Sequence, residues 1–287
     1  MRILLTGRTG QLGWELERAL AALGEVIAAD RARLDLSDPE AIRRTVREAR
    51  PGIIVNAAAY TAVDRAQSEP GIAARINATA AGILAAEAKL CSALLVHYST
   101  DYVFDGEKGA PYREEDAPHP LSVYGRTKLE GERAIEASGC RYLILRTSWV
   151  YASRGSNFLL TVLRLAGERK ELSIVGDQTG SPTAAHEVAA ATAAALAQEP
   201  APTGTFHMSA AGEASWYDFA REILARTGRK EIPLRRITTA EYPTAAQRPR
   251  YSVLSNEKIR ALGIALPDWR QSLAAVCRTF AADQVRP

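Results

Sequence analysis

The first 13 residues of the chain read MRILLTGRTGQLG, and a short apolar run, Ile3–Thr6, stands directly before the first of three glycines spaced three apart. A strand that leads through a glycine-rich turn into a helix is the arrangement that holds a pyrophosphate at a helix N-terminus in dinucleotide-binding folds. The spacing is G-x-x-G-x-x-G rather than G-x-G-x-x-G, so the glycines by themselves are a weak signal. Their place between a strand and a helix predicts a nucleotide site at the start of an α/β fold.

Apolar runs alternate with helical periods as far as about residue 150. After the first run, they lie at Val26–Asp30, Ile53–Asn56, Leu94–Ser99 and Tyr142–Arg146. Continuous apolar runs separated by amphipathic helices are typical of a parallel sheet covered on both faces. We therefore expect an α/β protein with a Rossmann-type, doubly wound parallel sheet. One of its helices is expected to begin with Ser37 as N-cap residue, before Pro39.

The length of 287 residues corresponds to about two domains. Residues 1–150 are expected to form the dinucleotide-binding domain, and residues 151–287 mainly a smaller, mixed α/β substrate-binding domain. A helix near 184–198 and a strand near 205–208 are expected to belong to the first domain. A loop is expected from Asp177 to Thr183, and later helices after Ser215 and Pro267.

Composition and charge exclude several classes of protein. With 47% hydrophobic and 24% charged residues, the chain is neither disordered nor fibrous, and a net charge of 36 − 33 = +3 does not indicate a nucleic-acid surface. Its apolar runs are too short for a signal-peptide core or a membrane span. The three cysteines lack metal-ligand spacing. We therefore expect a soluble, cytoplasmic protein with no membrane or nucleic-acid partner.

The end of the second predicted strand bears on the choice of cofactor. Asp30 stands 20 residues after Gly10, where an acidic side chain binds the adenosine ribose of NAD. Arg8, Arg31 and Arg33 lie around the same place and could bind the 2′-phosphate of NADP. The sequence leaves both cofactors open and slightly favours NADPH.

A tyrosine and a lysine four residues apart suggest the catalytic chemistry. Tyr124 and Lys128 would lie on one face of a helix, where an ammonium stabilises the ionised form of a phenol whose pKa is ordinarily near 10. Such a phenol can give a proton to a carbonyl oxygen. Thr100 follows the predicted strand that starts at Leu94, and its hydroxyl could bind the same oxygen. His97, inside that strand, is expected to be packed rather than catalytic.

These motifs together resemble the extended short-chain dehydrogenase/reductase family, which includes NAD-dependent epimerases and dehydratases. The similarity covers nearly the whole chain. Besides the glycine-rich loop, it includes VNAAAYTAVD (55–64), YSTDYVF (98–104), PLSVYGRTK (120–128), RTSWVY (146–151), DQTGSPT (177–183), RP (248–249) and LPDW (266–269).

The resemblance implies an NAD(P)H-dependent oxidoreductase that reduces the C4 carbonyl of dTDP-4-dehydro-6-deoxy-L-mannose to dTDP-L-rhamnose, a precursor of cell-surface polysaccharides. Tyr124 would be the proton donor, assisted by Lys128 and Thr100, while Asp101 and Trp149 would join Thr100 in contacting the nucleotide-sugar substrate. The residues implied for the cofactor, besides Tyr124 and Lys128, are Gly7, Gly10, Gln11, Leu12, Gly13, Asp30, Asp35, Leu36, Ala59, Tyr60, Thr61 and Tyr98.

One departure from the family concerns a metal. Some members dimerise through Mg²⁺ held by three glutamates, of which Glu15 matches the first. His186 stands at the second position, with Glu187 next to it, and no glutamate follows Glu257. Because Mg²⁺ requires oxygen ligands in a near-octahedral array, we expect no metal site, and a monomer or a metal-independent homodimer.

Two other functions remain possible from the sequence. A nucleotide-sugar dehydratase of the same superfamily would have Glu after Thr100-Asp101, where this chain has Tyr102, whereas an epimerase is harder to exclude. A non-catalytic cofactor-binding subunit, similar to the regulatory subunit of methionine adenosyltransferase, is disfavoured by the presence of Thr100, Tyr124 and Lys128.

Overall fold

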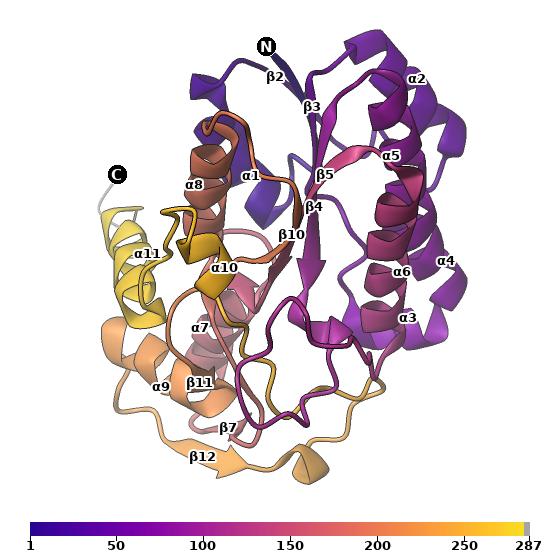
Figure 1. Cartoon of the computed structure of the whole chain (residues 1–287). Helices are drawn as coiled ribbons and strands as arrows, with labels where there is room; N and C mark the ends of the chain where they lie inside the picture. Colours follow the sequence, from indigo (N-terminus) through magenta and orange to yellow (C-terminus); the bar gives the residue numbers. More distant parts are fainter. Residues whose placement is uncertain (284–287) are drawn as a thin grey trace.

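A six-stranded parallel sheet forms the centre of the computed structural model, which describes residues 1–283 (Figure 1). Its strands run in the order β10-β5-β4-β3-β1-β2. Their bounds are β1 (Arg2–Thr6), β2 (Glu25–Ala29), β3 (Ile53–Asn56), β4 (Leu94–Thr100), β5 (Arg141–Thr147) and β10 (Gly204–His207). Each predicted strand lies within one residue of these bounds, so the predicted doubly wound parallel sheet is confirmed.

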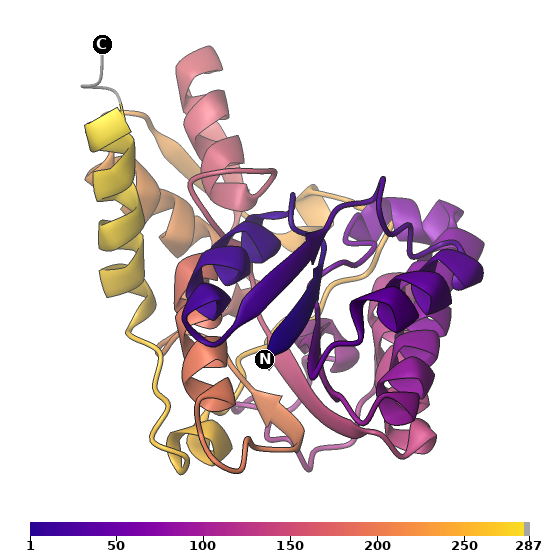
Figure 2. The same ribbon diagram turned by 90° about the horizontal axis from the view of Figure 1, so that it is seen from above.

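Helices cover both faces of this sheet, as the view from above shows (Figure 2). On one face, α1 (Gln11–Ala19), the 3₁₀ turn η1 (Leu20–Ala22) and α8 (Ala185–Leu196) pack against Ile3, Val55 and Val96. On the other face, α2 (Pro39–Ala49), α5 (Ala80–Leu90) and α6 (Val123–Ser138) pack against Leu4, Ile54 and Leu95. Because alternate strand residues point to opposite faces, the continuous apolar runs of the sequence serve both layers.

The connections on the second face are short helices. After β3 come α3 (Val63–Ser68), α4 (Pro70–Ala74) and the π-helical turn η2 (Arg75–Thr79), which continues into α5. The 3₁₀ turn η3 (Asp101–Val103) follows β4. These segments place the residues that follow β3 and β4 next to the first turns of α6.

The predicted start of α2 is wrong by one residue. Asp38, not Ser37, is the N-cap residue, and its carboxylate accepts hydrogen bonds from the backbone N–H groups of Glu40 and Ala41. The Ser37 hydroxyl instead donates to Asp35 at 2.7 Å. Pro39 therefore occupies the first helical position, where its missing N–H group costs nothing.

The second half of the chain forms helices and two-stranded sheets around a separate core containing Tyr151, Phe219 and Trp269. The helices α7 (Phe158–Glu168), α9 (Trp216–Arg226) and α11 (Trp269–Asp283) pack in this core. The 3₁₀ turn η4 (Thr239–Glu241) also lies in this half, whereas α10 (Glu257–Arg260) packs through Ile259 in the core on the α1 and α8 face of the central sheet. The paired strands of this half are β6 (Val150–Tyr151) with β9 (Thr183–Ala184), β7 (Leu172–Val175) with β12 (Leu234–Ile237), and β8 (Thr179–Gly180) with β11 (Ala214–Ser215). The predicted loop from 177 to 183 therefore contains β8 and reaches β9, which the glycine and proline in that stretch did not indicate. The helices predicted after Ser215 and Pro267 are confirmed as α9 and α11.

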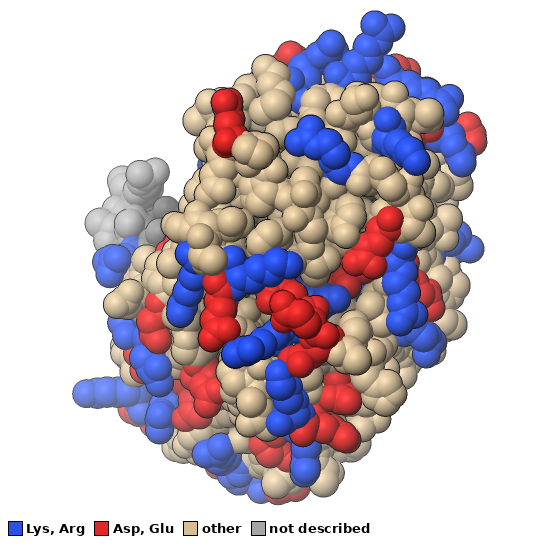
Figure 3. Space-filling view, in the orientation of Figure 1, with Lys and Arg blue, Asp and Glu red and all other residues tan. Residues whose placement is uncertain are grey.

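Within residues 1–283, no helix is both long and apolar enough to cross a membrane. Basic and acidic side chains are interspersed on the face drawn in Figure 3, in keeping with the small net charge.

Candidate active site

The glycine-rich loop joins β1 to α1 at the carboxyl edge of the sheet, and its geometry excludes side chains. Gly7 has φ +72°, and a Cβ there would lie 2.9 Å from the Ala58 Cα atom. A Cβ on Gly13 would lie 2.1 Å from the Gly7 carbonyl oxygen. Gly10 caps α1 without a side-chain hydrogen bond, so the first N–H groups of the helix are free of a side-chain cap. The glycines therefore let the loop fold tightly onto itself and onto the segment after β3, and the N–H groups at the start of α1 are the donors that could hold a pyrophosphate.

Three of the residues predicted to distinguish the two cofactors lie on the turn after β2, and Arg8 lies beside them in the glycine-rich loop, where its backbone N–H donates to the Ala29 carbonyl. The Asp30 carboxylate accepts a hydrogen bond from the Arg33 backbone N–H at 3.1 Å. Arg31 is largely exposed and pairs with Asp35, while Arg8 pairs with Glu17 at 3.0 Å. Carboxylate and guanidinium groups are thus both present here, and the geometry does not choose between a ribose and a 2′-phosphate.

Other residues implied for the cofactor surround this edge of the sheet. Leu12 and Leu36 are buried in the two cores. Gln11 bonds to the Val150 carbonyl at 3.0 Å and so joins α1 to the second half of the chain. In the loop 59–61, which follows β3, the Tyr60 backbone N–H donates to Asn77 at 2.8 Å.

Tyr124 and Lys128 project from the first two turns of α6, which Ser122 caps. The turn can approach η3, which follows β4, closely because residue 125 is glycine: a Cβ there would lie 2.1 Å from the Tyr102 carbonyl oxygen. Burial raises the pKa of Tyr124 to about 12, and a hydrogen bond with Thr100 lowers it to a smaller extent. Thr100 and Tyr124 therefore lie together at the carboxyl end of β4, where ligands bind in open α/β sheets.

Lys128 is buried, and its ammonium group contacts β4. Its Nζ atom donates to the Tyr98 carbonyl at 2.6 Å and lies 3.0 Å from Nε2 of His97. Burial lowers the pKa of Lys128 to about 8, and the nearby Glu132 carboxylate raises it to a smaller extent. The side chain of Tyr98 points to the other face of the sheet, where its hydroxyl lies 2.7 Å from that of Thr192.

Asp101 holds three hydroxyl groups, two of them from distant parts of the chain. Its carboxylate accepts hydrogen bonds from Thr100 at 3.0 Å, Ser148 at 3.1 Å and Ser252 at 2.6 Å. Burial raises the pKa of Asp101 to about 6, against the opposing effect of these bonds. Through these hydrogen bonds, Asp101 connects the ends of β4 and β5 to Ser252, in the segment that precedes α10. The contact of Asp101 with the sugar stays a prediction.

Trp149 follows β5 in a left-handed backbone conformation, with φ +46°. Its ring stacks on that of Trp216 with centroids 3.4 Å apart and planes 1° from parallel. A Cβ on Gly180 would lie 2.5 Å from the Trp149 ring, so the glycine of the sequence DQTGSPT makes room for this pair. Trp149 is thereby fixed at the border between the two halves of the chain.

Sequence reasoning missed several polar residues of this region. Asn56 and His97 are buried and hydrogen-bonded to one another at 3.0 Å, and His97 also contacts Lys128. His97 is packed, as expected, but its ring is part of a polar network. The signal was available: polar residues occur near the carboxyl ends of two neighbouring apolar strands. Ser148, Ser252 and Trp216 gave no such signal.

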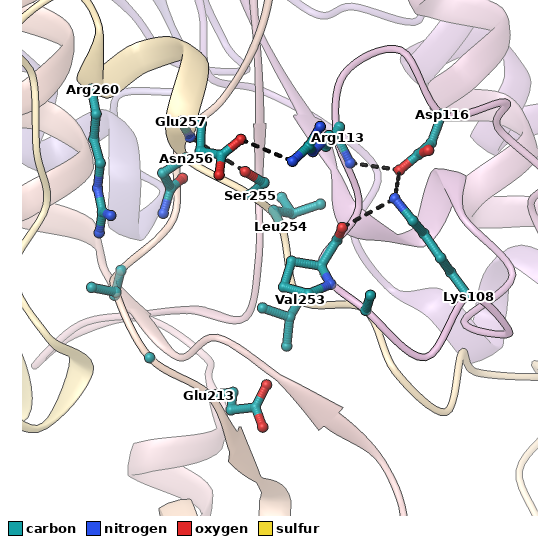
Figure 4. A pocket seen from close by; sticks show the side chains of 15 residues that line it. Lys108, Arg113, Asp116, Glu213, Val253, Leu254, Ser255, Asn256, Glu257 and Arg260 are labelled. Carbon is teal, nitrogen blue, oxygen red and sulfur yellow. Dashed lines mark hydrogen bonds and ion pairs between the residues drawn. The ribbon is translucent and has the colours of Figure 1, made fainter.

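A pocket of about 690 Å³ lies between the loop 108–116, which follows η3, and the segment 253–260, which includes α10 (Figure 4). Arg113 and Glu257 approach to 3.3 Å across it, and Lys108 is ion-paired with Asp116. None of the predicted site residues lines this pocket.

The prediction that no metal binds was made from Glu15, which lies on α1, and from His186 and Glu187, which lie on α8. His186 and Glu187 approach to 3.2 Å, and burial raises the pKa of Glu15 against the smaller, opposing effect of nearby His186. Among residues 1–283 there is no group of three His, Cys, Asp or Glu residues placed to hold a metal ion.

Comparisons with known proteins connect this arrangement to one family. Residues 1–282 match the model of the RmlD substrate binding domain. The chain is 48% identical to dTDP-4-dehydrorhamnose reductase of Burkholderia thailandensis, covering 97% of this chain and 98% of that protein. It is also 48% identical to the Escherichia coli K12 protein of the same name, covering 94% and 95% of the two chains.

A solved structure agrees with these relatives. The crystal structure of dTDP-4-dehydrorhamnose reductase from Bacillus anthracis in complex with NADP superposes with a TM-score of 0.92 at 36% identity, covering 96% of this chain and 98% of that one. The chain therefore belongs to the RmlD substrate binding domain family, the family of the dTDP-4-dehydrorhamnose reductases.

Proposed function

We propose that the chain catalyses the NADPH-dependent reduction of the C4 carbonyl of dTDP-4-dehydro-6-deoxy-L-mannose, giving dTDP-L-rhamnose. The observation that carries this proposal is that Thr100, Tyr124 and Lys128 meet at the same edge of the sheet as the glycine-rich loop. A cofactor held at the loop would extend along this edge toward the three side chains. The substrate is inferred from the family to which the chain belongs.

Tyr124 is the proposed proton donor. Because burial keeps its pKa near 12, the phenol retains its proton at neutral pH. It can transfer this proton to the C4 oxygen as negative charge develops there. The positive charge of Lys128 favours the phenolate that remains. The Thr100 hydroxyl orients the substrate oxygen beside the phenol. NADPH, when bound, supplies the hydride that reaches C4.

The cofactor would rest on the glycine-rich loop, with its pyrophosphate at the N-terminus of α1. Asp30 and the arginines Arg8, Arg31 and Arg33 would surround the adenosine ribose. The relative with bound NADP supports NADPH as the cofactor, while the Asp30 carboxylate, which could bind the adenosine ribose, is also compatible with NADH.

The two halves of the chain would divide the work. Residues 1–150, with α8 and β10, would bind the cofactor, and the remainder of residues 151–287 would bind the sugar nucleotide. Asp101 and Trp149 stand where the halves meet, and each is already held by residues of the second half, Ser252 and Trp216. We also propose that the enzyme acts in the cytoplasm, as a monomer or a metal-independent dimer.

Turnover with the two nicotinamide cofactors tests the proposal. The purified chain is mixed with the 4-dehydro sugar nucleotide and NADPH, and the loss of reduced nicotinamide absorbance is followed; the assay is repeated with NADH. Oxidation that requires the sugar nucleotide, faster with NADPH, is the expected result. Absence of oxidation with both cofactors would contradict the proposal and favour the non-catalytic binding subunit.

A further inference from the structure

Three polar side chains form a row across neighbouring strands beneath the first turns of α6. Thr6 of β1 is in register with Asn56 of β3, which is in register with His97 of β4. Each lies two residues beyond an apolar side chain that packs on the α2, α5 and α6 face, so all three point to that face. Lys128 of α6 meets the end of this row.

The contacts are continuous. Oγ1 of Thr6 lies 2.7 Å from Oδ1 of Asn56, Nδ2 of Asn56 lies 3.0 Å from Nδ1 of His97, and Nε2 of His97 lies 3.0 Å from Nζ of Lys128. All four residues are at most 2% exposed. Since water cannot replace a lost partner at such sites, each member depends on the orientation of the next.

We propose that His97 is a positioning residue for the reduction, which fixes the Lys128 ammonium group by accepting a hydrogen bond at Nε2, while the Asn56 amide pairs with Nδ1. This inference rests on the proposed function, in which Lys128 assists Tyr124. An ammonium group has three donors and no acceptor. The Tyr98 carbonyl takes one donor and His97 a second, which leaves the third for the reacting groups.

The donors and acceptors of the row permit two arrangements. When Lys128 is charged, Nε2 accepts, Nδ1 carries the proton and donates to Oδ1 of Asn56, and the amide nitrogen faces Thr6. When Lys128 is a neutral amine, every bond reverses: Nδ2 of Asn56 donates to Nδ1, and Nε2 donates to Lys128. The two ends of an amide have nearly the same shape, so both arrangements fit the same heavy-atom positions.

The histidine therefore changes tautomer when the lysine changes charge. His97 itself stays neutral, because burial, and to a smaller extent the charge of Lys128, hold its pKa well below the usual range. Besides His97, the charged group that acts on Lys128 is Glu132 on α6. Arg146 of β5 binds Glu132 through two nitrogens and offsets its charge.

Nitrogen-15 NMR of histidine-labelled protein without cofactor or substrate tests the inference apart from turnover. The chain has four histidines, and the His97→Gln variant identifies the signal of His97. At pH 6.5 we expect the proton on Nδ1. Above about pH 8, where Lys128 loses its proton, it should move to Nε2, and Lys128→Met should abolish this change. One unchanging tautomer between pH 6 and 10, or a charged His97 above pH 6, would overturn the inference.

Three substitutions at His97 distinguish the roles of its two ring nitrogens. Glutamine can reach Lys128 as Nε2 does, asparagine can reach only Asn56 as Nδ1 does, and leucine replaces neither. We expect His97→Asn and His97→Leu to lower kcat by roughly 10- to 100-fold with little change in the KM for NADPH, since small displacements of a reacting group are costly. His97→Gln should recover most of the loss, within about threefold of the parent kcat.

The pH profile gives a second readout. Without the acceptor at Nε2, the ammonium form of Lys128 is less stable, so the alkaline limb of kcat should move to lower pH in His97→Leu and not in His97→Gln. His207→Leu is the matched control, because His207 is a buried histidine of the sheet whose ring bonds to the Tyr112 carbonyl. It should lower stability without moving the limb. Equal kcat values for the Gln and Leu variants, or a parental kcat in His97→Leu, would refute the role.

Discussion

At the scale of single residues, the phenol of Tyr124 is the proposed proton donor. Replacing it by Phe removes the proton donor and leaves the ring, which packs edge-on against Tyr102 with centroids 5.9 Å apart. We expect Tyr124→Phe to lower kcat by about 10²- to 10⁴-fold, the usual contribution of a general acid, with unchanged NADPH binding by fluorescence titration. Tyr142→Phe, at the far end of β5, is the control. A loss of only a few-fold would assign the proton to another group.

Asp101 should make stability depend on pH. Its pKa is raised from 3.8 to about 6, so between these values the folded chain binds more protons than the unfolded chain. The free energy of unfolding therefore falls as pH rises through this window, and the carboxylate disfavours folding above it. Relative to Asp101→Asn, the parent should lose about 2.4 kcal/mol of stability between pH 4 and 7, the larger part of the total of about 3 kcal/mol that a pKa raised from 3.8 to about 6 gives at about 1.4 kcal/mol per unit. Urea unfolding at each pH measures this difference, and parallel pH curves for the two proteins would contradict it.

Single residues differ in how much of their surroundings the sequence can predict. Tyr124, Lys128 and Thr100 could be proposed as site residues because each belongs to a short motif next to a recognisable strand or helix. Asp101 could be proposed as a motif member, but its partner Ser252 lies 151 residues further along the chain. No local pattern encodes a contact of that separation, and the bonds of a buried carboxylate depend on tertiary packing.

At the scale of elements, α6 depends on a glycine for its position. A Cβ at residue 125 would press on the Tyr102 carbonyl oxygen and move the turn that carries Tyr124 and Lys128. We expect Gly125→Ala to lower the free energy of unfolding by about 1–3 kcal/mol, as overpacking does, and to lower kcat by at least roughly tenfold through misplacement. Thermal unfolding and steady-state kinetics measure the two effects.

Gly71→Ala is the control for this substitution. Gly71 lies in α4 with no atom within 4 Å of the added methyl group. There alanine should leave kcat unchanged and, through its higher helix propensity, alter stability by less than about 1 kcal/mol in the favourable direction. If both glycine variants behaved alike, the close approach of α6 to Tyr102 would not be what places the site.

The start of α2 gives an element-scale prediction with a built-in comparison. Asp38 accepts two backbone N–H groups of the first turn, whereas Ser37 bonds to Asp35 outside the helix. Asp38→Ala should lower the free energy of unfolding by about 1 kcal/mol, the usual value of an N-cap. Ser37→Ala should cost about 0.5 kcal/mol or less, as for one partly exposed hydrogen bond. If urea unfolding showed that Asp38→Ala and Ser37→Ala lower the free energy of unfolding equally, Asp38 would not be the residue that caps α2.

This comparison also explains how well the elements were predicted. Strand positions depend on hydrophobic runs and were placed within one residue. The choice between Ser37 and Asp38 depends on which of two adjacent acceptors meets the helix N–H groups, and both residue types favour that position. The short strands β8 and β9 pair with distant segments, β11 and β6, so their local sequence resembles a loop.

At the scale of the whole molecule, the two halves are joined by polar contacts as well as by packing. Arg248 binds Asp64 at 2.6 Å across 184 positions of the chain, and Gln11 bonds to the Val150 carbonyl. The sequence predicted that α8 and β10 would belong with the first half, because a strand near residue 205 could return to the first sheet. It could not predict the contacts between the halves, which depend on how they pack.

The assembly of the molecule should not depend on Mg²⁺. Glu15 of α1 faces an imidazole, His186 of α8, where a carboxylate would be needed, and Mg²⁺ prefers oxygen ligands in a near-octahedral array. Treatment with EDTA should therefore leave the mass measured by light scattering, the melting temperature and kcat unchanged. Glu15→Gln, which removes the carboxylate, should likewise leave the mass unchanged. A dimer that becomes a monomer in EDTA and re-forms when Mg²⁺ is restored would show that other oxygen ligands complete the site, and the Glu15→Gln variant would then fail to re-form it.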